Sequence, residues 1–181
     1  QVVVEIGPTP NGGPSTASAT IVINEFRTSG PSGPNDEFIE LRNLGNAPVD
    51  LTGWSIAINT ATNHRESLGR ILGPAVVSPG CYYLLTGAGG PNAYSSGGIA
   101  LGDFRWASTF FQDDTSFALL DPPGNLIDQV GLSASPLSTE GPPLGPLVGR
   151  SRERPADSND NASDFRPSGQ DNPRNMGSSC Q

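Results

Sequence analysis

The 181-residue sequence contains no lysine, and all ten of its basic residues are arginine. Catalysis through a lysine Schiff base or a lysine general base is therefore excluded. Aspartate and glutamate together number 18, so the formal net charge at pH 7 is −8. Because proteins that bind nucleic acid present a basic surface to the phosphates, this charge balance argues against a nucleic-acid partner.

Histidine is almost as scarce, since His64 is the only one. His64 lies in a polar stretch and no Gly-x-Ser-x-Gly motif surrounds any serine, so we interpret it as a surface loop residue and not as part of a catalytic triad. One histidine and two cysteines do not supply the ligands of a zinc site. No run of 18 apolar residues is present, so the sequence predicts no membrane insertion.

Glycine and proline are abundant, with 23 and 18 residues, and they interrupt nearly every stretch that could form a long helix. Short apolar or alternating segments between turn residues instead predict an all-β sandwich or barrel. The strands we expect cover residues 2–6, 20–27, 36–43, 54–58, 81–85, 117–120 and 126–130, with weaker candidates at 101–106 and 109–111.

Two of these segments allow an assignment of faces. Alternation along 20–27 places Val22 and Phe26 on one face. Ile21 and Ile23 then lie on the other face, so both faces are apolar, as in a central strand. Residues 36–43 alternate apolar and charged residues, which predicts a strand with Ile39 and Leu41 on one face and Glu40 and Arg42 on the other.

The two cysteines, Cys81 and Cys180, form an even set. The sequence begins at Gln1 instead of methionine, which we interpret as processing of a secreted protein, and disulfides persist in that environment. We therefore predict one disulfide, the alternative being two unpaired thiols. It would close a loop of about 100 residues and contribute roughly 4–5 kcal/mol in the chain-entropy model.

Several motifs follow one another in order along the chain. Residues 23–26 carry Asn-Glu, residues 37–43 carry Glu-x-Ile-Glu-Leu-x-Asn, and residues 50–54 carry Asp-Leu-x-Gly-Trp. A Pro-Gly-x-x-x-x-Leu strand at 79–85, an Asp- and Gly-containing hairpin at 119–128, and Arg154 with Asn-x-x-Asp-Phe at 161–165 complete the set. Together these motifs resemble the lamin-tail family over roughly residues 20–166.

The resemblance implies an immunoglobulin-like β-sandwich over residues 20–166, in which the domain is a non-catalytic module of a secreted or cell-surface protein. Residues 1–19 form an N-terminal extended strand arm with its linker, outside the resemblance. Residues 167–181 form an irregular C-terminal tail tied down at Cys180. The DNA binding attributed to some lamin tails is not expected here, because the chain is acidic.

Two groups of polar residues are candidate sites. Glu25, Glu37 and Glu40 lie on neighbouring predicted strands and, if they converge, could serve as the carboxylate pair of a glycosidase. We favour the interpretation that they accept hydrogen bonds from backbone or arginine groups at the end of the sheet.

We expect no cofactor, although the second group is rich in oxygen ligands and could bind calcium. Its spacing begins like an EF-hand loop, but Ala162 replaces the required glycine and no glutamate closes it. We favour a loop stabilised by Asx turns. Residues 161–163 also form an N-glycosylation sequon. The calcium candidates are Asp157, Asn159, Asn161 and Asp164, with Asp160 beside them.

The N-terminal arm contains a cluster of apolar residues, namely Val2, Val3, Val4 and Ile6. They pair either with the chain's own sandwich or with a neighbouring copy by strand addition. We predict a non-catalytic extracellular structural protein that self-assembles into a filament or surface layer through this arm. The alternative is a monomeric cell-surface module that binds a glycan or a protein.

Overall fold

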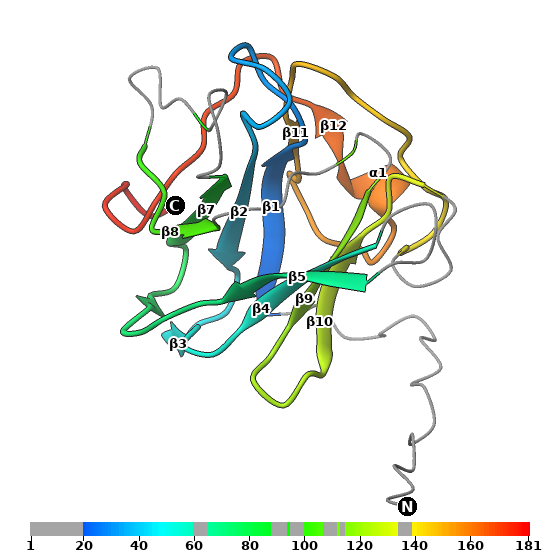
Figure 1. The fold of residues 1–181 in the computed structure, drawn as a ribbon. Coiled ribbons are helices and arrows are strands. Elements are labelled where there is room, and N and C mark those ends of the chain that lie inside the picture. The colour runs from blue at the N-terminus through cyan, green and yellow to red at the C-terminus, as the bar shows by residue number, and fades with distance from the viewer. Residues whose placement is uncertain are drawn as a thin grey trace, which may run out of the picture.

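The computed structural model describes residues 20–59, 65–87, 94, 100–106, 112, 115–133 and 139–181. Two facing β-sheets form the body of the molecule (Figure 1). The N-terminal arm, His64 and the candidate strand 109–111 lie outside the described residues.

The larger sheet has six strands in the order β12-β11-β1-β2-β7-β8. Its pairs are antiparallel except for β7 and β8, which are parallel. The strands are β1 (Ile21–Arg27), β2 (Phe38–Asn43), β7 (Tyr82–Gly87), β8 (Phe104–Trp106), β11 (Arg152–Glu153) and β12 (Arg166–Pro167).

The smaller sheet has four antiparallel strands in the order β10-β9-β4-β5, and a two-stranded ribbon pairs β3 with β6. A single helical turn, α1 (Asn161–Asp164), precedes β12. The strands are β3 (Val49–Asp50), β4 (Ser55–Asn59), β5 (Arg65–Arg70), β6 (Val76–Val77), β9 (Ser116–Leu120) and β10 (Leu126–Val130).

A single apolar core fills the space between the sheets. Phe26 lies at its centre, with its ring in edge-to-face contact with Phe117 at 5.4 Å and Phe165 at 5.3 Å between centroids. Ile39 and Leu41 point into this core, as the alternation along their strand predicts. The expectation of an all-β, immunoglobulin-like β-sandwich is confirmed.

The face assignment along β1 is wrong, because a β-bulge interrupts the strand. Ile23 lies opposite Leu41 and Glu25 lies opposite Glu40, so β1 holds one extra residue at this point. Side chains after the extra residue therefore point to the face opposite to the one that uninterrupted alternation predicts. As a result Ile21, Ile23 and Phe26 all belong to the central core, whereas Val22 is buried but does not.

Two polar stretches also form more regular structure than their sequences predict. Residues 65–70, which lack the alternation of a typical strand, pair with β4 as β5 and bury only Leu68 among the side chains described there. The region after residue 150, for which the sequence predicts no strand, contributes β11, α1 and β12. In both cases pairing with a neighbouring strand decides the structure where local propensity is weak.

Cys81 and Cys180 form the predicted disulfide, which spans 99 residues of sequence. The disulfide joins the start of β7 to the last residues of the chain. The C-terminal segment, drawn in red, therefore runs back beside β7 and β8 (Figure 1).

Candidate functional site

Three glutamates stand in one row across the larger sheet. Glu25 on β1 lies directly opposite Glu153 on β11 and Glu40 on β2. We call Glu153, Glu25 and Glu40 the glutamate row. Adjacent strands are about 4.8 Å apart, so the three carboxylates lie close together, and like charges placed directly opposite are destabilising.

The C-terminal segment supplies the charge that offsets this repulsion at Glu40, whose side chain is completely buried. Its Oε1 accepts hydrogen bonds from Asn24 Nδ2 at 2.7 Å and from Arg174 Nη2 at 3.1 Å, while its Oε2 accepts from the Arg174 backbone N–H and from Nε at 3.3 Å. Burial raises the pKa of Glu40, and the hydrogen bonds and charge of Arg174 oppose that rise.

Glu25 is enclosed in the same way, with 1% of its surface exposed. Its Oε1 accepts a hydrogen bond from Ser151 Oγ at 2.5 Å and a longer one from the backbone N–H of Asn172 at 3.4 Å. Burial raises the pKa of Glu25 to about 7, and repulsion from Glu40 and Glu153 adds to the rise.

Glu37 does not join the other two glutamates. It precedes β2 by one residue, so strand alternation places it on the face opposite to Glu40. Its carboxylate lies beside Gly87 instead. The structure therefore brings together Glu25 and Glu40, but not the full set of three.

This arrangement does not support glycoside hydrolysis. A glycosidase needs both carboxyl groups to reach the scissile bond of a sugar. Glu25 and Glu40 are buried beneath the C-terminal segment and accept its N–H groups. The alternative interpretation, that these glutamates accept backbone and arginine hydrogen bonds, matches the contacts.

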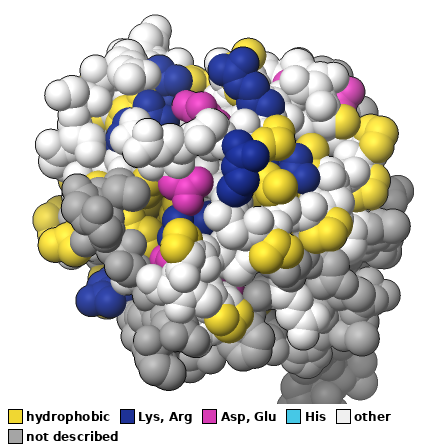
Figure 2. All heavy atoms as spheres, turned by 90° about the horizontal axis from the view of Figure 1, so that it is seen from above, with side chains coloured by type: hydrophobic (Ala, Val, Ile, Leu, Met, Phe, Trp, Pro, Cys, Tyr) yellow, Lys and Arg dark blue, Asp and Glu magenta, His cyan; other side chains and the backbone are white. Residues whose placement is uncertain are grey.

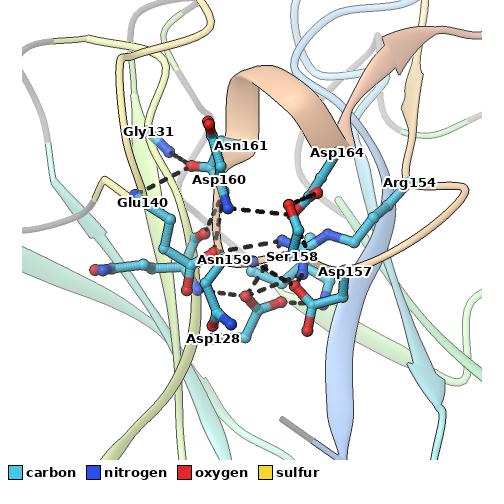
Figure 3. A network of polar contacts seen from close by, with 12 residues as sticks. Asp128, Gly131, Glu140, Arg154, Asp157, Ser158, Asn159, Asp160, Asn161 and Asp164 are labelled. Carbon is cyan, nitrogen blue, oxygen red and sulfur yellow. Dashed lines mark hydrogen bonds and ion pairs between the residues drawn. The ribbon is translucent and has the colours of Figure 1, made fainter. Parts of the chain in front are cut away.

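A second polar network surrounds the buried Arg154 (Figure 3). The guanidinium donates to Asp128 Oδ1 at 3.2 Å and to Asp157 Oδ1 at 2.9 Å, and it stacks 4.5 Å from the ring centroid of Phe165. Burial raises the pKa of Asp128 to about 6, although the charge of Arg154 lowers it. Burial likewise raises the pKa of Glu140 to about 8, with Asp128 adding to the effect.

The proposed calcium ligands belong to this network. Asp157 accepts from Arg154, and Asp164 accepts from the backbone N–H of Ser158 at 2.9 Å and from its hydroxyl. Asn159 adopts a left-handed conformation with φ of 59°. Within the described residues, no group of three or more His, Cys, Asp and Glu side chains is placed to hold a metal ion. The contacts are those of a loop organised by Asx-type hydrogen bonds and an arginine.

Asn161, another of the calcium candidates, acts as a structural link between α1 and β10 (Figure 3). Its Oδ1 accepts from the backbone N–H of Gly131 at 3.0 Å, and its Nδ2 donates to the Gln129 carbonyl at 3.0 Å and to Glu140 Oε2 at 3.2 Å. The side chain is fully buried, so the sequon amide is enclosed in the folded chain. Asp160 caps α1 by accepting from the Ala162 backbone N–H.

The ends of the two sheets differ in how well they are covered. β12 and β8 are short. At the β10 edge, Asn161 Nδ2 donates to the Gln129 carbonyl and the Leu144 N–H donates to the Gly131 carbonyl. β5 is the longest of the terminal strands in the described residues and pairs only with β4. A bulge at Leu68–Gly69, with φ of 110° at Gly69, interrupts its second half. The regular stretch of this edge therefore runs over residues 65–67.

Sequence reasoning missed two arginines, Arg27 and Arg174, that form ion pairs with buried carboxylates. Arg27 forms buried ion pairs with Asp36 and Asp171, and Arg174 pairs with Glu40. Of the arginines that form buried ion pairs, only Arg154 was singled out in the sequence, through its place in the last of the family motifs. The signal for the others is that a buried carboxylate in a chain without lysine can form an ion pair with little else than arginine.

Comparison with protein families gives a match to the Lamin Tail Domain over residues 14–134, two thirds of the chain. Within the described residues no helix is long and apolar enough to cross a membrane. The disulfide is compatible with an extracellular location. No curated protein matches the chain. The family consists of immunoglobulin-like, generally non-catalytic binding or structural modules, and this chain belongs to the Lamin Tail Domain family.

Proposed function

We propose that the protein is a non-catalytic extracellular structural protein that assembles with copies of itself, into a filament or a surface layer. The N-terminal arm supplies the strand that joins one copy to the next. The observation that carries the proposal is the open edge of β5, which pairs with β4 on one side only among the described residues.

An exposed strand edge presents backbone N–H and C=O groups to any extended segment of suitable sequence. Strand addition uses these groups for affinity and alternate side chains for specificity. Val2, Val3, Val4 and Ile6 have strong β propensity and a large apolar surface to bury. They therefore suit pairing with the regular part of β5, residues 65–67.

The residues between the arm and the sandwich allow the contact to reach another copy. Residues 7–19 consist mainly of Gly, Pro, Ser, Thr and Asn, and a flexible linker of this length spans roughly 20 Å. Because the arm and the β5 edge are different surfaces, the contact is head-to-tail. A head-to-tail contact whose rotation does not close produces a filament.

Light scattering of three purified proteins tests the proposal. These are the full chain, a deletion of residues 1–19, and a full-length variant in which Val2, Val3, Val4 and Ile6 are replaced by serine. We expect the full chain to assemble and the other two to remain monomeric, with unchanged circular dichroism. The serine variant keeps the linker and chain length, so it isolates the apolar side chains. Equal assembly of all three proteins would refute the role of the arm.

A monomeric cell-surface binding module is the second candidate. Arginine side chains lie in several groups among apolar side chains on the end of the molecule seen from above (Figure 2). The exposed Arg150 and Arg166 belong to the segments around β11 and β12. An arginine guanidinium can donate two parallel hydrogen bonds to a carboxylate or sulfate group of an anionic glycan. A monomeric full chain that binds heparin, with binding lost on Arg150→Ala and Arg166→Ala, would favour this function.

A further inference from the structure

The C-terminal segment, residues 168–181, is held against the outer face of the larger sheet by contacts along its length. The carboxylate of Asp171 pairs with Arg27, and the backbone N–H of Met176 donates to Asp103 Oδ2 at 3.0 Å. The last residue, Gln181, donates its N–H to the Gly80 carbonyl at 3.0 Å. The segment thus lies on the sheet as a peptide lies on a receptor, with a turn over residues 175–178.

Arg174 occupies this face in the manner of a bound ligand. Its guanidinium carbon lies 4.0 Å from the ring centroid of Tyr82, and Nη1 donates to the Tyr82 hydroxyl at 2.9 Å. Nη2 pairs with Glu40 Oε1 at 3.1 Å and lies 3.8 Å from Glu153 Oε1. A carboxylate partner combined with an aromatic face is the chemistry by which proteins recognise arginine.

The receiving groups come from the sheet itself, so they are in place whether or not the segment is bound. Glu153, Glu25 and Glu40 stand on three adjacent strands, and Tyr82 stands on the next strand, β7. Asn24 donates to Glu40 from beside the row and orients its carboxylate. Without a cation from the segment, the row would hold three neighbouring carboxylates in a partly desolvated site, which is unfavourable.

One covalent bond keeps the segment on this face. Beyond β12 the disulfide between Cys81 and Cys180 is the one covalent link between the segment and the sandwich, and all its other contacts are non-covalent. Cys180 is exposed, so a small thiol has access to it. A thiolate attacks Cys180, Cys81 leaves as a thiolate, and a second thiol resolves the mixed disulfide. Two thiols thereby become one disulfide of the reductant, and the protein gains two thiols.

We propose that the outer face of the larger sheet is a recognition site for an arginine-bearing peptide, which the chain's own C-terminal segment occupies and the disulfide locks. After reduction, the segment exchanges for residues 168–181 of a second copy, which carries the same complementary groups. This site uses neither residues 1–19 nor β5, so it does not depend on the function proposed above.

A peptide-binding experiment tests the site with the full chain. The receiving protein is the Arg174→Ala variant, because its own segment lacks the guanidinium that would compete. The probe is a fluorescent synthetic peptide of residues 168–181 with Cys180→Ser, followed by fluorescence anisotropy. We expect the protein reduced with dithiothreitol to bind this peptide at least about 10-fold more tightly than the oxidised protein does.

Two matched changes show whether the arginine site is responsible. A peptide carrying Arg174→Ala should bind about 10- to 100-fold more weakly, and so should the original peptide when the receiving protein also carries Glu40→Gln. Binding that is independent of reduction, of the peptide arginine or of Glu40 would overturn the proposal. So would the absence of binding to a reduced protein whose near-UV circular dichroism is native.

Hydrogen exchange of the unmodified chain provides a second test that needs no variant. Reduction should remove the protection of the Arg174 and Met176 amides, which donate to Glu40 and Asp103. The amides of β1 and β2 should keep their protection, because their pairing does not involve the segment. Unchanged protection of Arg174 and Met176 after complete reduction would show that the segment does not exchange.

Discussion

Arg174 and Glu40 form an ion pair that joins the C-terminal segment to the centre of the larger sheet. Nη2 of Arg174 lies 3.1 Å from Oε1 of Glu40, and the two side chains are 12% and 0% exposed. Removing one partner of such a pair leaves a buried charge without its counterion. The stability of the fold therefore depends on a contact between residues 134 positions apart.

Replacement of Arg174 by alanine should lower the free energy of unfolding by about 3–5 kcal/mol, because Glu40 is left buried and unpaired. Urea unfolding of the oxidised protein measures the change. The Glu40→Gln, Arg174→Ala double variant should recover part of the loss, which defines the coupling between the two residues. The exposed Arg166 provides a control, since Arg166→Ala should cost less than about 0.5 kcal/mol.

Removal of the disulfide should lower the free energy of unfolding by about 4–5 kcal/mol, because it releases a loop closed over 99 residues. The comparison is between the oxidised chain and the Cys81→Ser, Cys180→Ser variant, measured by urea unfolding. Reduced unmodified chain should match the double-serine variant. A loss below about 1 kcal/mol would show that the C-terminal contacts alone restrain the chain.

Stability should fall as the pH rises from about 4.5 to about 7. The unfolded chain loses the Glu25 proton near the ordinary pKa of 4.5, whereas the folded chain retains it until about 7. The folded state therefore binds more protons in this window, and its advantage disappears as the pH passes the folded pKa. The contribution of Glu25 amounts to about 3 kcal/mol.

The Glu25→Gln variant isolates this contribution. Glutamine keeps an oxygen to accept from Ser151 but does not ionise. We expect it to be more stable than the unmodified chain at pH 8 and to show a shallower pH dependence in urea unfolding. Glu140, whose pKa rises to about 8, adds a slope of the same sign that remains in the variant. An unchanged slope would indicate that Glu25 titrates normally.

Asn161→Ala should cost about 2–4 kcal/mol, because it leaves the Gly131 N–H and the Gln129 carbonyl without their partner. Thermal or urea unfolding measures the loss. Ser163→Ala is the matched control two residues away, since the Ser163 hydroxyl makes only an exposed hydrogen bond to Asp160. A cost for Asn161→Ala no larger than that of the control would contradict the structural role of the amide.

Calcium should not alter the thermal midpoint. The candidate ligands Asp157 and Asp164 already accept hydrogen bonds from Arg154 and Ser158. A ligand that binds only the folded state raises its stability by RT ln(1 + [L]/Kd), so a site with millimolar affinity would be detectable at 10 mM calcium. Scanning calorimetry in 10 mM calcium and in chelator makes the comparison. A higher midpoint in calcium would restore the calcium hypothesis.

The fold could be predicted from local patterns wherever a strand has one clear apolar face. The alternation of Ile39 and Leu41 with Glu40 identified β2 and the face that packs into the core between the sheets, although the face that carries Glu40 is buried as well. The even cysteine count identified the disulfide. These features can be read from sequence because strand periodicity and thiol pairing depend on the residues themselves.

The candidate site could be predicted only in part. The sequence marked Glu25, Glu37 and Glu40 as a group, although alternation places Glu37 and Glu40 on opposite faces of their strand. It did not show that Glu25 lies opposite Glu40, because the bulge between Ile23 and Glu25 shifts the register of β1. The bulge is hard to recognise from the sequence, because β1 carries apolar residues on both faces and an extra residue does not break the apolar pattern.

The sequence by itself determined an all-β, acidic, lysine-free domain whose strands, turns and cysteine pair follow from local chemistry. Only the tertiary structure decided that the glutamates form a row and that Arg174 covers it. Register and contacts between distant segments depend on how whole sheets pack, and no local window of sequence contains both partners.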